Sequence, residues 1–146
     1  MKTTSSIKTK ASAKGMIDDY DHSQVFITKE GYYTNGHWML KPEYVTKLLK
    51  RRIQTMGGAQ ERNVDSEFLF EDHEHREIEY DRSEDIIACV VAIYKAEYLE
   101  IGFNEEYIAW LQKNIPGFGL KACDSKQATF IMSGDEITGA IMPVRL

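Results

Sequence analysis

The sequence has few of the residues that hold small secreted or metal-binding domains together. It contains two cysteines in 146 residues, and Cys89 and Cys123 lie in apolar runs, without partners at zinc-ligand spacing. We therefore expect two free, buried thiols in a reducing compartment. Long apolar runs are also missing, because the stretch from Ile86 to Tyr94 is far shorter than the roughly 20 residues that cross a bilayer.

The N-terminal residues and the net charge limit the expected location and partners. Residues 1–15 lack the apolar core of a secretory signal, so a cytoplasmic protein without membrane contact is expected. The net charge of −5 argues against a protein that coats DNA indiscriminately, because neutralisation of phosphates drives such binding. A local basic surface remains compatible with this charge.

The sequence has no motif that signals catalysis. A glycine-rich phosphate loop, a nucleophile elbow and a paired zinc motif are all missing from it. We therefore expect a protein that is not an enzyme and that needs neither cofactor nor metal.

What is present fits one globular domain. Hydrophobic residues make up 42% and charged residues 28% of the chain, which is ordinary for a folded protein. Residues 1–22 are rich in Ser, Thr and Lys and lack periodicity, which predicts a flexible tail. Residues 23–146 are predicted to form the domain.

The first part of the domain reads as strands followed by a helix. Segments 25–28, 32–34 and 37–40 are β-rich and are separated by turn residues, which predicts two hairpins. Pro42 suits the first turn of a helix, and apolar residues recur at helical spacing from Val45 to Ile53 until Gly57 stops it. We expect this helix to start at Pro42.

The second part repeats that order. Weak strand patterns at 67–70 and 77–80 precede a buried strand from Ile86 to Tyr94, which we expect to pair antiparallel with 98–103. Asn104 can cap a helix that runs until Pro116. Three strands are predicted to follow, at 120–123, 129–133 and 137–144, with a hairpin turn at 133–136. The fold class is therefore α+β, with two similar β-α-β-β-β halves in an antiparallel sheet and two helices on one face.

Three short segments resemble a known family. Residues 100–114 contain a Phe-Asn-x-x-Tyr motif, residues 141–146 read Ile-Met-Pro-Val-Arg-Leu, and residues 34–39 read Thr-Asn-Gly-His-Trp-Met before a proline-started helix. They resemble segments of the β subunit of bacterial DNA polymerase III, the sliding clamp, with its Thr-Asp-Gly-His-Arg-Leu turn and Met-Pro-Met-Arg-Leu ending. The resemblance covers 97–146 and 25–55, but not 1–24 or 56–85. It implies a DNA-clamp-like domain.

In the clamp these segments build a pocket for linear motifs of polymerases, the clamp loader and repair proteins. The resemblance therefore implies a processivity factor of DNA replication with a peptide-binding pocket. Apolar walls with flexible methionines and a few polar groups suit such a pocket. The residues it implies are Thr34, Gly36, His37, Trp38, Met39, Pro42, Asn104, Tyr107, Ile141, Met142, Pro143, Val144, Arg145 and Leu146.

The chain departs from the family in two ways. A clamp chain has three such domains, so a ring built from this chain would be a homo-oligomer of about six copies. Trp38 replaces the family's arginine. The pocket can form within one chain or between chains.

Four cations would face double-stranded DNA in a ring, although they equally suit the end of a solvated helix. These cations are Lys47, Lys50, Arg51 and Arg52.

Two alternatives remain open. The protein can be a phage or mobile-element clamp mimic that sequesters clamp-binding partners without encircling DNA. Alternatively, Asp72 to His75 could form the site of a metal-dependent hydrolase, since the segment reads Asp-His-Glu-His. In a strand, however, the two histidines would face one side and the two acids the other.

Overall fold

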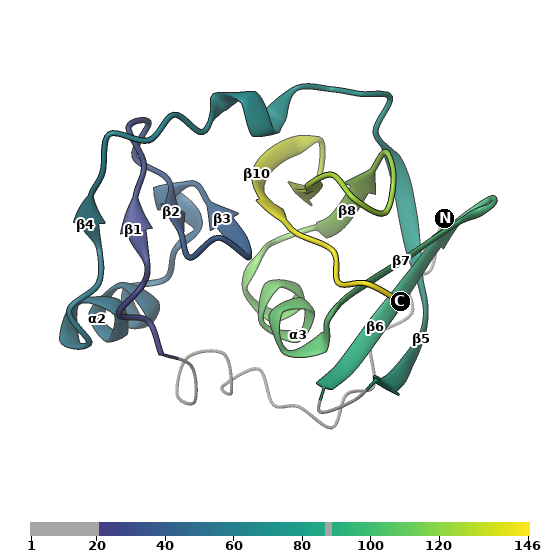
Figure 1. The fold of residues 1–146 in the computed structure, drawn as a ribbon, viewed down its shortest axis with the longest axis horizontal. Helices are drawn as coiled ribbons and strands as arrows, with labels where there is room; N and C mark the ends of the chain where they lie inside the picture. The colour runs from purple at the N-terminus through teal and green to yellow at the C-terminus, as the bar shows by residue number, and fades with distance from the viewer. Residues whose placement is uncertain (1–20, 87–88) are drawn as a thin grey trace.

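A computed structural model describes residues 21–86 and 89–146, which form two α-helices and one mixed sheet (Figure 1). The ten strands are ordered β4-β1-β2-β3-β10-β9-β8-β5-β6-β7. The α+β class expected from the sequence is therefore confirmed. No helix among the described residues has the length and apolar character needed to span a membrane.

Two hairpins open the domain, as predicted. β1 (Phe26–Ile27) pairs antiparallel with β2 (Tyr33–Thr34), and β2 pairs antiparallel with β3 (Trp38–Leu40). The second turn forms because Gly36 adopts a φ of 92°, which is costly for other residues. Residues 1–20 of the predicted tail lie outside the described residues, whereas His22 is buried and its backbone N–H contacts the Met56 sulfur.

The first helix begins later than predicted. Pro42–Tyr44 form a separate 3-10 turn (η1), and Val45 is extended. α2 (Lys47–Thr55) starts only after Thr46, whose side chain accepts a hydrogen bond from the Leu49 N–H at 3.2 Å. The start at Pro42 was wrong because Thr46 is the stronger cap.

A long segment crosses the sheet between β4 (Gln60–Glu61) and β5 (Arg76–Ile86), at the top of Figure 1. We call residues 62–71 the strap. It contains a 3-10 turn, η2 (Glu67–Phe70), where a strand was predicted. That prediction was wrong because adjacent apolar residues give no alternation, and the Leu69 N–H bonds back to the Ser66 carbonyl at 3.1 Å.

β5, β6 (Cys89–Ala96) and β7 (Leu99–Asn104) form an antiparallel meander. The expected pairing of the last two strands is confirmed. A single strand over Ile86–Tyr94 was wrong, since Ile86 ends β5 and pairs antiparallel with Cys89, the first residue of β6. The sequence between Ile86 and Cys89 holds no glycine, proline or asparagine, so the apolar run conceals the change of strand.

The last part of the chain matches the prediction closely. Asn104 caps α3 (Glu105–Asn114) by accepting a hydrogen bond from the Glu106 N–H at 2.9 Å. β8 (Phe118–Ala122), β9 (Thr129–Ser133) and β10 (Glu136–Ile141) then form a second meander. β10 ends at Ile141, earlier than predicted, and Val144 forms only one bridge, to Gly102.

The two predicted halves repeat in order but not in pairing. From β3 onward the elements run β3-α2-β4-β5-β6 and β7-α3-β8-β9-β10. However, β4 pairs parallel with β1 at the sheet edge, whereas β8 pairs antiparallel with β5 and β9. The expectation of a wholly antiparallel sheet was therefore wrong, because the chain returns through α2 to the edge of β1, where β4 enters in the same direction as β1.

One row of side chains, the inner row, marks the helix-covered face of the sheet. Leu40, Gly139, Ile131, Leu120 and Ile78 are successive cross-strand partners from β3 to β5. The four apolar side chains of this row are at most 5% exposed. They belong to one core cluster that also holds residues of α2 and α3, which places both helices on the same face, as predicted.

Candidate functional site

The other face of the sheet carries a second row of side chains, the outer row. On β3, β10 and β9 its residues are the sequence neighbours of the inner-row residues. Thr34, Met39, Ala140 and Phe130 are successive partners across β2, β3, β10 and β9. In a strand, neighbouring residues point to opposite faces, so these four residues turn away from the helices. The strap covers this row in place of a helix.

Polar contacts attach the strap to the first hairpin. Ser66 is 1% exposed, and its backbone N–H donates to the Glu30 carboxylate at 2.8 Å. Its hydroxyl contacts the hydroxyl of Thr28 at 3.0 Å, and the Lys29 N–H donates to the Val64 carbonyl at 2.9 Å. Because the serine hydrogen bonds favour the ionised carboxylate, they lower the pKa of Glu30.

Aromatic side chains fix the far end of the strap. Phe70 lies between Tyr32 and Phe130, with ring centroids 5.6 Å and 6.3 Å away, respectively. The Tyr32 hydroxyl donates to the Glu67 carboxylate at 2.9 Å. The strap is therefore held at Ser66 and at Phe70, and the stretch between them borders the sheet.

An open apolar groove lies between the strap and strands β1–β3 and β10. Its volume is about 280 Å³, and it reaches Met142 just beyond β10. Three of its apolar side chains are exposed: Val64 (43%), Phe68 (62%) and Met142 (37%). Exposed apolar side chains gathered around a hollow mark a binding surface more often than isolated ones do. We take this groove as the candidate site.

A second hollow of about 280 Å³ continues the groove along the same edge of the strap. Both hollows are bordered by Phe68, Leu69, Ala128 and Met142. The second hollow adds polar residues, namely Glu71, His73, His75 and Gln127. The site is therefore one elongated groove, apolar at one end and polar at the other.

Six of the residues implied by the clamp resemblance border the groove: Thr34, Gly36, His37, Trp38, Met39 and Met142. The Trp38 side chain does not form an aromatic wall of the pocket. It is 2% exposed and belongs to the core on the helix-covered side of the sheet. Its neighbour Met39 faces the groove.

The remaining residues of the C-terminal segment lie beside the groove and tie the end of the chain to β7. Ile141 is buried in the core. The Met142 N–H donates to the His37 carbonyl at 2.9 Å, and the Val144 N–H donates to the Gly102 carbonyl at 2.8 Å. A side chain on Gly102 would meet Leu146 at 2.6 Å. Pro143, Val144, Arg145 and Leu146 do not border the groove, and neither does Pro42.

Asn104 and Tyr107 lie at the start of α3, and Tyr107 contacts Asn35 in the Gly-His turn. Tyr107 is 8% exposed, and burial raises its pKa while a hydrogen bond with Asn35 opposes that rise. Asn104 serves as the cap of α3. The three clamp-like segments therefore lie together within one chain, although neither Asn104 nor Tyr107 borders the groove.

Sequence reasoning missed the wall that the strap provides. Val64, Phe68 and Leu69 line the groove but lie in the segment that has no resemblance to the clamp. Their signal in the sequence is apolar residues within a strongly charged stretch. That signal shows an exposed apolar segment without showing which strands it crosses.

The Asp72–His75 segment is a turn before β5, so the strand geometry assumed for it was wrong. His75 stacks on Phe130 with ring centroids 3.7 Å apart. Its Nδ1 accepts the His73 N–H at 3.1 Å, and its Nε2 lies 3.2 Å from the Ala128 carbonyl. Among the described residues, no three His, Cys, Asp or Glu side chains are placed to hold a metal ion.

The four predicted DNA-facing cations lie on α2. Lys47, Arg51 and Arg52 are exposed, whereas Lys50 is half-buried, with its Nζ 5.9 Å from the centroid of the Tyr33 ring. α3 offers no comparable surface, since six of its ten residues are buried. Of the two α-helices that the structure describes, only α2 therefore presents a basic surface.

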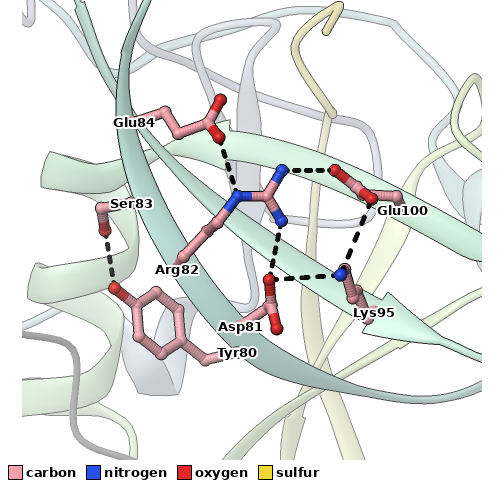
Figure 2. A network of polar contacts seen from close by, with 7 residues as sticks. All are labelled: Tyr80, Asp81, Arg82, Ser83, Glu84, Lys95 and Glu100. Atoms are coloured by element: carbon pink, nitrogen blue, oxygen red, sulfur yellow. Dashed lines mark hydrogen bonds and ion pairs between the residues drawn. The ribbon is translucent and has the colours of Figure 1, made fainter.

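A second charged cluster covers β5–β7 (Figure 2). The Arg82 guanidinium contacts Glu84 at 2.7 Å, Asp81 at 2.7 Å and Glu100 at 2.8 Å, and Lys95 lies 3.4 Å from Asp81. These carboxylates, Glu84 first, raise the pKa of Arg82 further. Because Arg82 on β5 contacts Glu100 on β7, and Lys95 on β6 contacts Asp81 on β5, we interpret the cluster as a cross-strand brace.

No protein-family model matches this chain, and comparisons with curated proteins and with solved structures give no match either. Any function therefore has to be inferred from the fold and from the groove.

Proposed function

We propose that the chain is a sliding-clamp-like DNA-replication accessory protein whose groove binds a short linear motif of a polymerase, clamp loader or related protein. One observation carries this proposal. Met39 of the Gly-His segment and Met142 of the C-terminal segment, which resemble two parts of the clamp pocket, line one open apolar groove in a single chain.

The chemistry of the groove suits an apolar peptide side chain. Met39 and Met142 adapt to varied shapes, and the exposed ring of Phe68 offers a large rigid contact area. His37 and Thr34 also line this hollow, and the Thr34 hydroxyl donates to the Trp38 carbonyl at 2.7 Å, which fixes the Gly-His turn. A few placed polar groups in an apolar hollow of this kind fix the orientation of a ligand.

The distribution of charge favours peptide capture without a ring around DNA. Lys47, Arg51 and Arg52 form one exposed basic patch, but α3 is largely buried and begins with Glu105 and Glu106. A ring lined by both helices would therefore present only one cationic helix per copy. The clamp-mimic version of the proposal needs only the groove.

Fluorescence polarisation with a labelled pentapeptide that carries the clamp-binding motif tests the groove. We expect saturable binding to the wild type and a loss of at least tenfold in Met142→Lys, because the substitution places a charge in an apolar site. Leu48→Lys is the matched control, since Leu48 is 47% exposed on α2. No binding by the wild type, or equal losses in both variants, would refute the proposed site.

Size-exclusion chromatography with light scattering separates the mimic from the ring. The mimic predicts a monomer or dimer that ignores DNA. A ring predicts about six copies, together with DNA affinity that falls steeply with salt and with Arg51→Ala. A hexamer with these properties would overturn the mimic version while leaving the peptide site in place.

A further inference from the structure

The polar end of the groove differs in charge from its apolar end. At the apolar end, Asp65 is the only Asp, Glu, Lys or Arg among the lining residues, and the Arg62 guanidinium lies 4.6 Å from the centroid of the ring of Phe26, which also lines this end. At the polar end, Glu71 is the only Asp, Glu, Lys or Arg among the lining residues. Each end is therefore lined by one acidic side chain, and at the apolar end the Arg62 cation lies beside the lining.

The polar groups around Glu71 are already engaged. The His75 side chain is 3% exposed and is held by Phe130, by the His73 N–H and by the Ala128 carbonyl. The Gln127 amide lies 3.3 Å from the Asp124 carboxylate. His75 and Gln127 therefore form a wall of the groove beside Glu71.

The Glu71 carboxylate itself remains accessible. Its side chain is 67% exposed, and its contact with His73 Nε2, at 3.7 Å, is ionic only when that histidine is protonated. A lysine or arginine side chain can rest its aliphatic part on Phe68 and Leu69 while its charged end reaches Glu71. An acidic side chain in the same place would meet a like charge.

We infer that the groove selects linear motifs in which a basic residue flanks the apolar anchor, with the cation over Glu71 and the anchor against Met39 and Phe68. This inference rests on the proposed peptide-binding function and adds a charge preference to it. The ligand class is therefore a basic-flanked apolar segment of a partner protein.

Four labelled peptides test the preference by polarisation. Each is the pentapeptide used above, extended by two lysines or two glutamates at one end or the other. For one of the two peptide termini, the lysine-extended peptide should bind about threefold more tightly than the glutamate-extended peptide. A difference in affinity of this size is expected for a single exposed ion pair. The difference should shrink in high salt because such pairs are screened.

Charge reversal assigns the preference to Glu71. In Glu71→Lys the order of the two peptides should invert, whereas Asp135→Lys, the same change of charge on the β9–β10 turn, should leave it unaltered. Equal binding of all four peptides, with an undiminished loss in Met142→Lys, would overturn the charge preference and leave the groove intact. If none of the four peptides binds, both the charge preference and the proposed function are overturned.

Discussion

Two neighbouring rows of side chains cross the same strands and have opposite surroundings. The inner row, with Leu40 and Ile131, is covered by two helices and is fully buried. The outer row, with Met39 (6% exposed) and Phe130 (2%), is also buried, but it is covered by a strap held at Ser66 and Phe70. One face is closed by apolar packing, and the other is held by a few polar and aromatic contacts that leave a groove open.

This comparison separates stability from binding. Burial of apolar area supplies most of the free energy of folding, so the helix-covered core cluster, which contains Leu40 and Ile131 of the inner row, should dominate stability. A surface that binds a partner has to leave apolar atoms uncovered, as at Phe68 on the strap. Substitutions on the two faces should therefore affect different measurements.

The largest effect on stability is expected on the inner row. Leu40→Ala removes a side chain with no exposed area and leaves a cavity in the helix-covered core. We expect the free energy of unfolding to fall by about 2–5 kcal/mol. Urea denaturation followed by circular dichroism measures this loss. A loss below about 0.5 kcal/mol would contradict the description of this face as the main core.

A smaller effect is expected where the strap is attached. Ser66→Ala removes the hydroxyl that contacts Thr28 and Glu30 and leaves both with one partner fewer. We expect a loss of about 1–2 kcal/mol in urea denaturation, because buried polar groups lose a partner. Hydrogen exchange of the Lys29 amide, which donates to Val64, should also accelerate. Ser125→Ala, at an exposed position, is the control and should change neither quantity.

Acid should remove the contribution of Glu30. Hydrogen bonds from Ser66 hold its pKa below the ordinary glutamate value in the folded state. Its contribution is therefore complete above the pKa of the unfolded chain and is lost as the pH falls through the folded pKa. The stability difference between wild type and Glu30→Gln should be largest near pH 7 and should vanish in acid. A difference that grows as the pH falls would contradict this assignment.

The smallest stability effect is expected at the open edge of the groove. Phe68 is 62% exposed, so Phe68→Ala should change the free energy of unfolding by less than about 0.5 kcal/mol. The same substitution should weaken pentapeptide binding at least tenfold, because it removes a groove wall. Thermal denaturation and polarisation on one preparation measure both effects. Unchanged peptide binding would show that Phe68 is not part of the binding site.

Local patterns predicted the elements that carry strong local signals. The Asn35-Gly36 turn, the Asn104 cap and the strand Thr129–Ser133 all appear where the sequence places them. Each depends on interactions within a few residues, such as a positive φ at glycine or a side-chain cap. The α+β class followed from the order of these elements.

The remaining features depend on contacts between distant residues. The change from β5 to β6 after Ile86 depends on the long pairing of these two strands, and no glycine, proline or asparagine precedes Cys89 to signal it. Whether Trp38 or Met39 faces the groove depends on the register of β3 against β10. The groove itself forms only because the strap crosses the outer row, which no local pattern in residues 62–71 reveals.

Amide chemical-shift mapping of the pentapeptide complex tests the central claim most directly. Peptide added to the labelled protein should shift amides of the strap, of Thr34–Met39 and around Met142, while α2 and the outer surface of β5–β7 remain unchanged. Shifts confined to α2 or to β5–β7, or no shifts at saturating peptide, would contradict the assignment of the groove as the binding site.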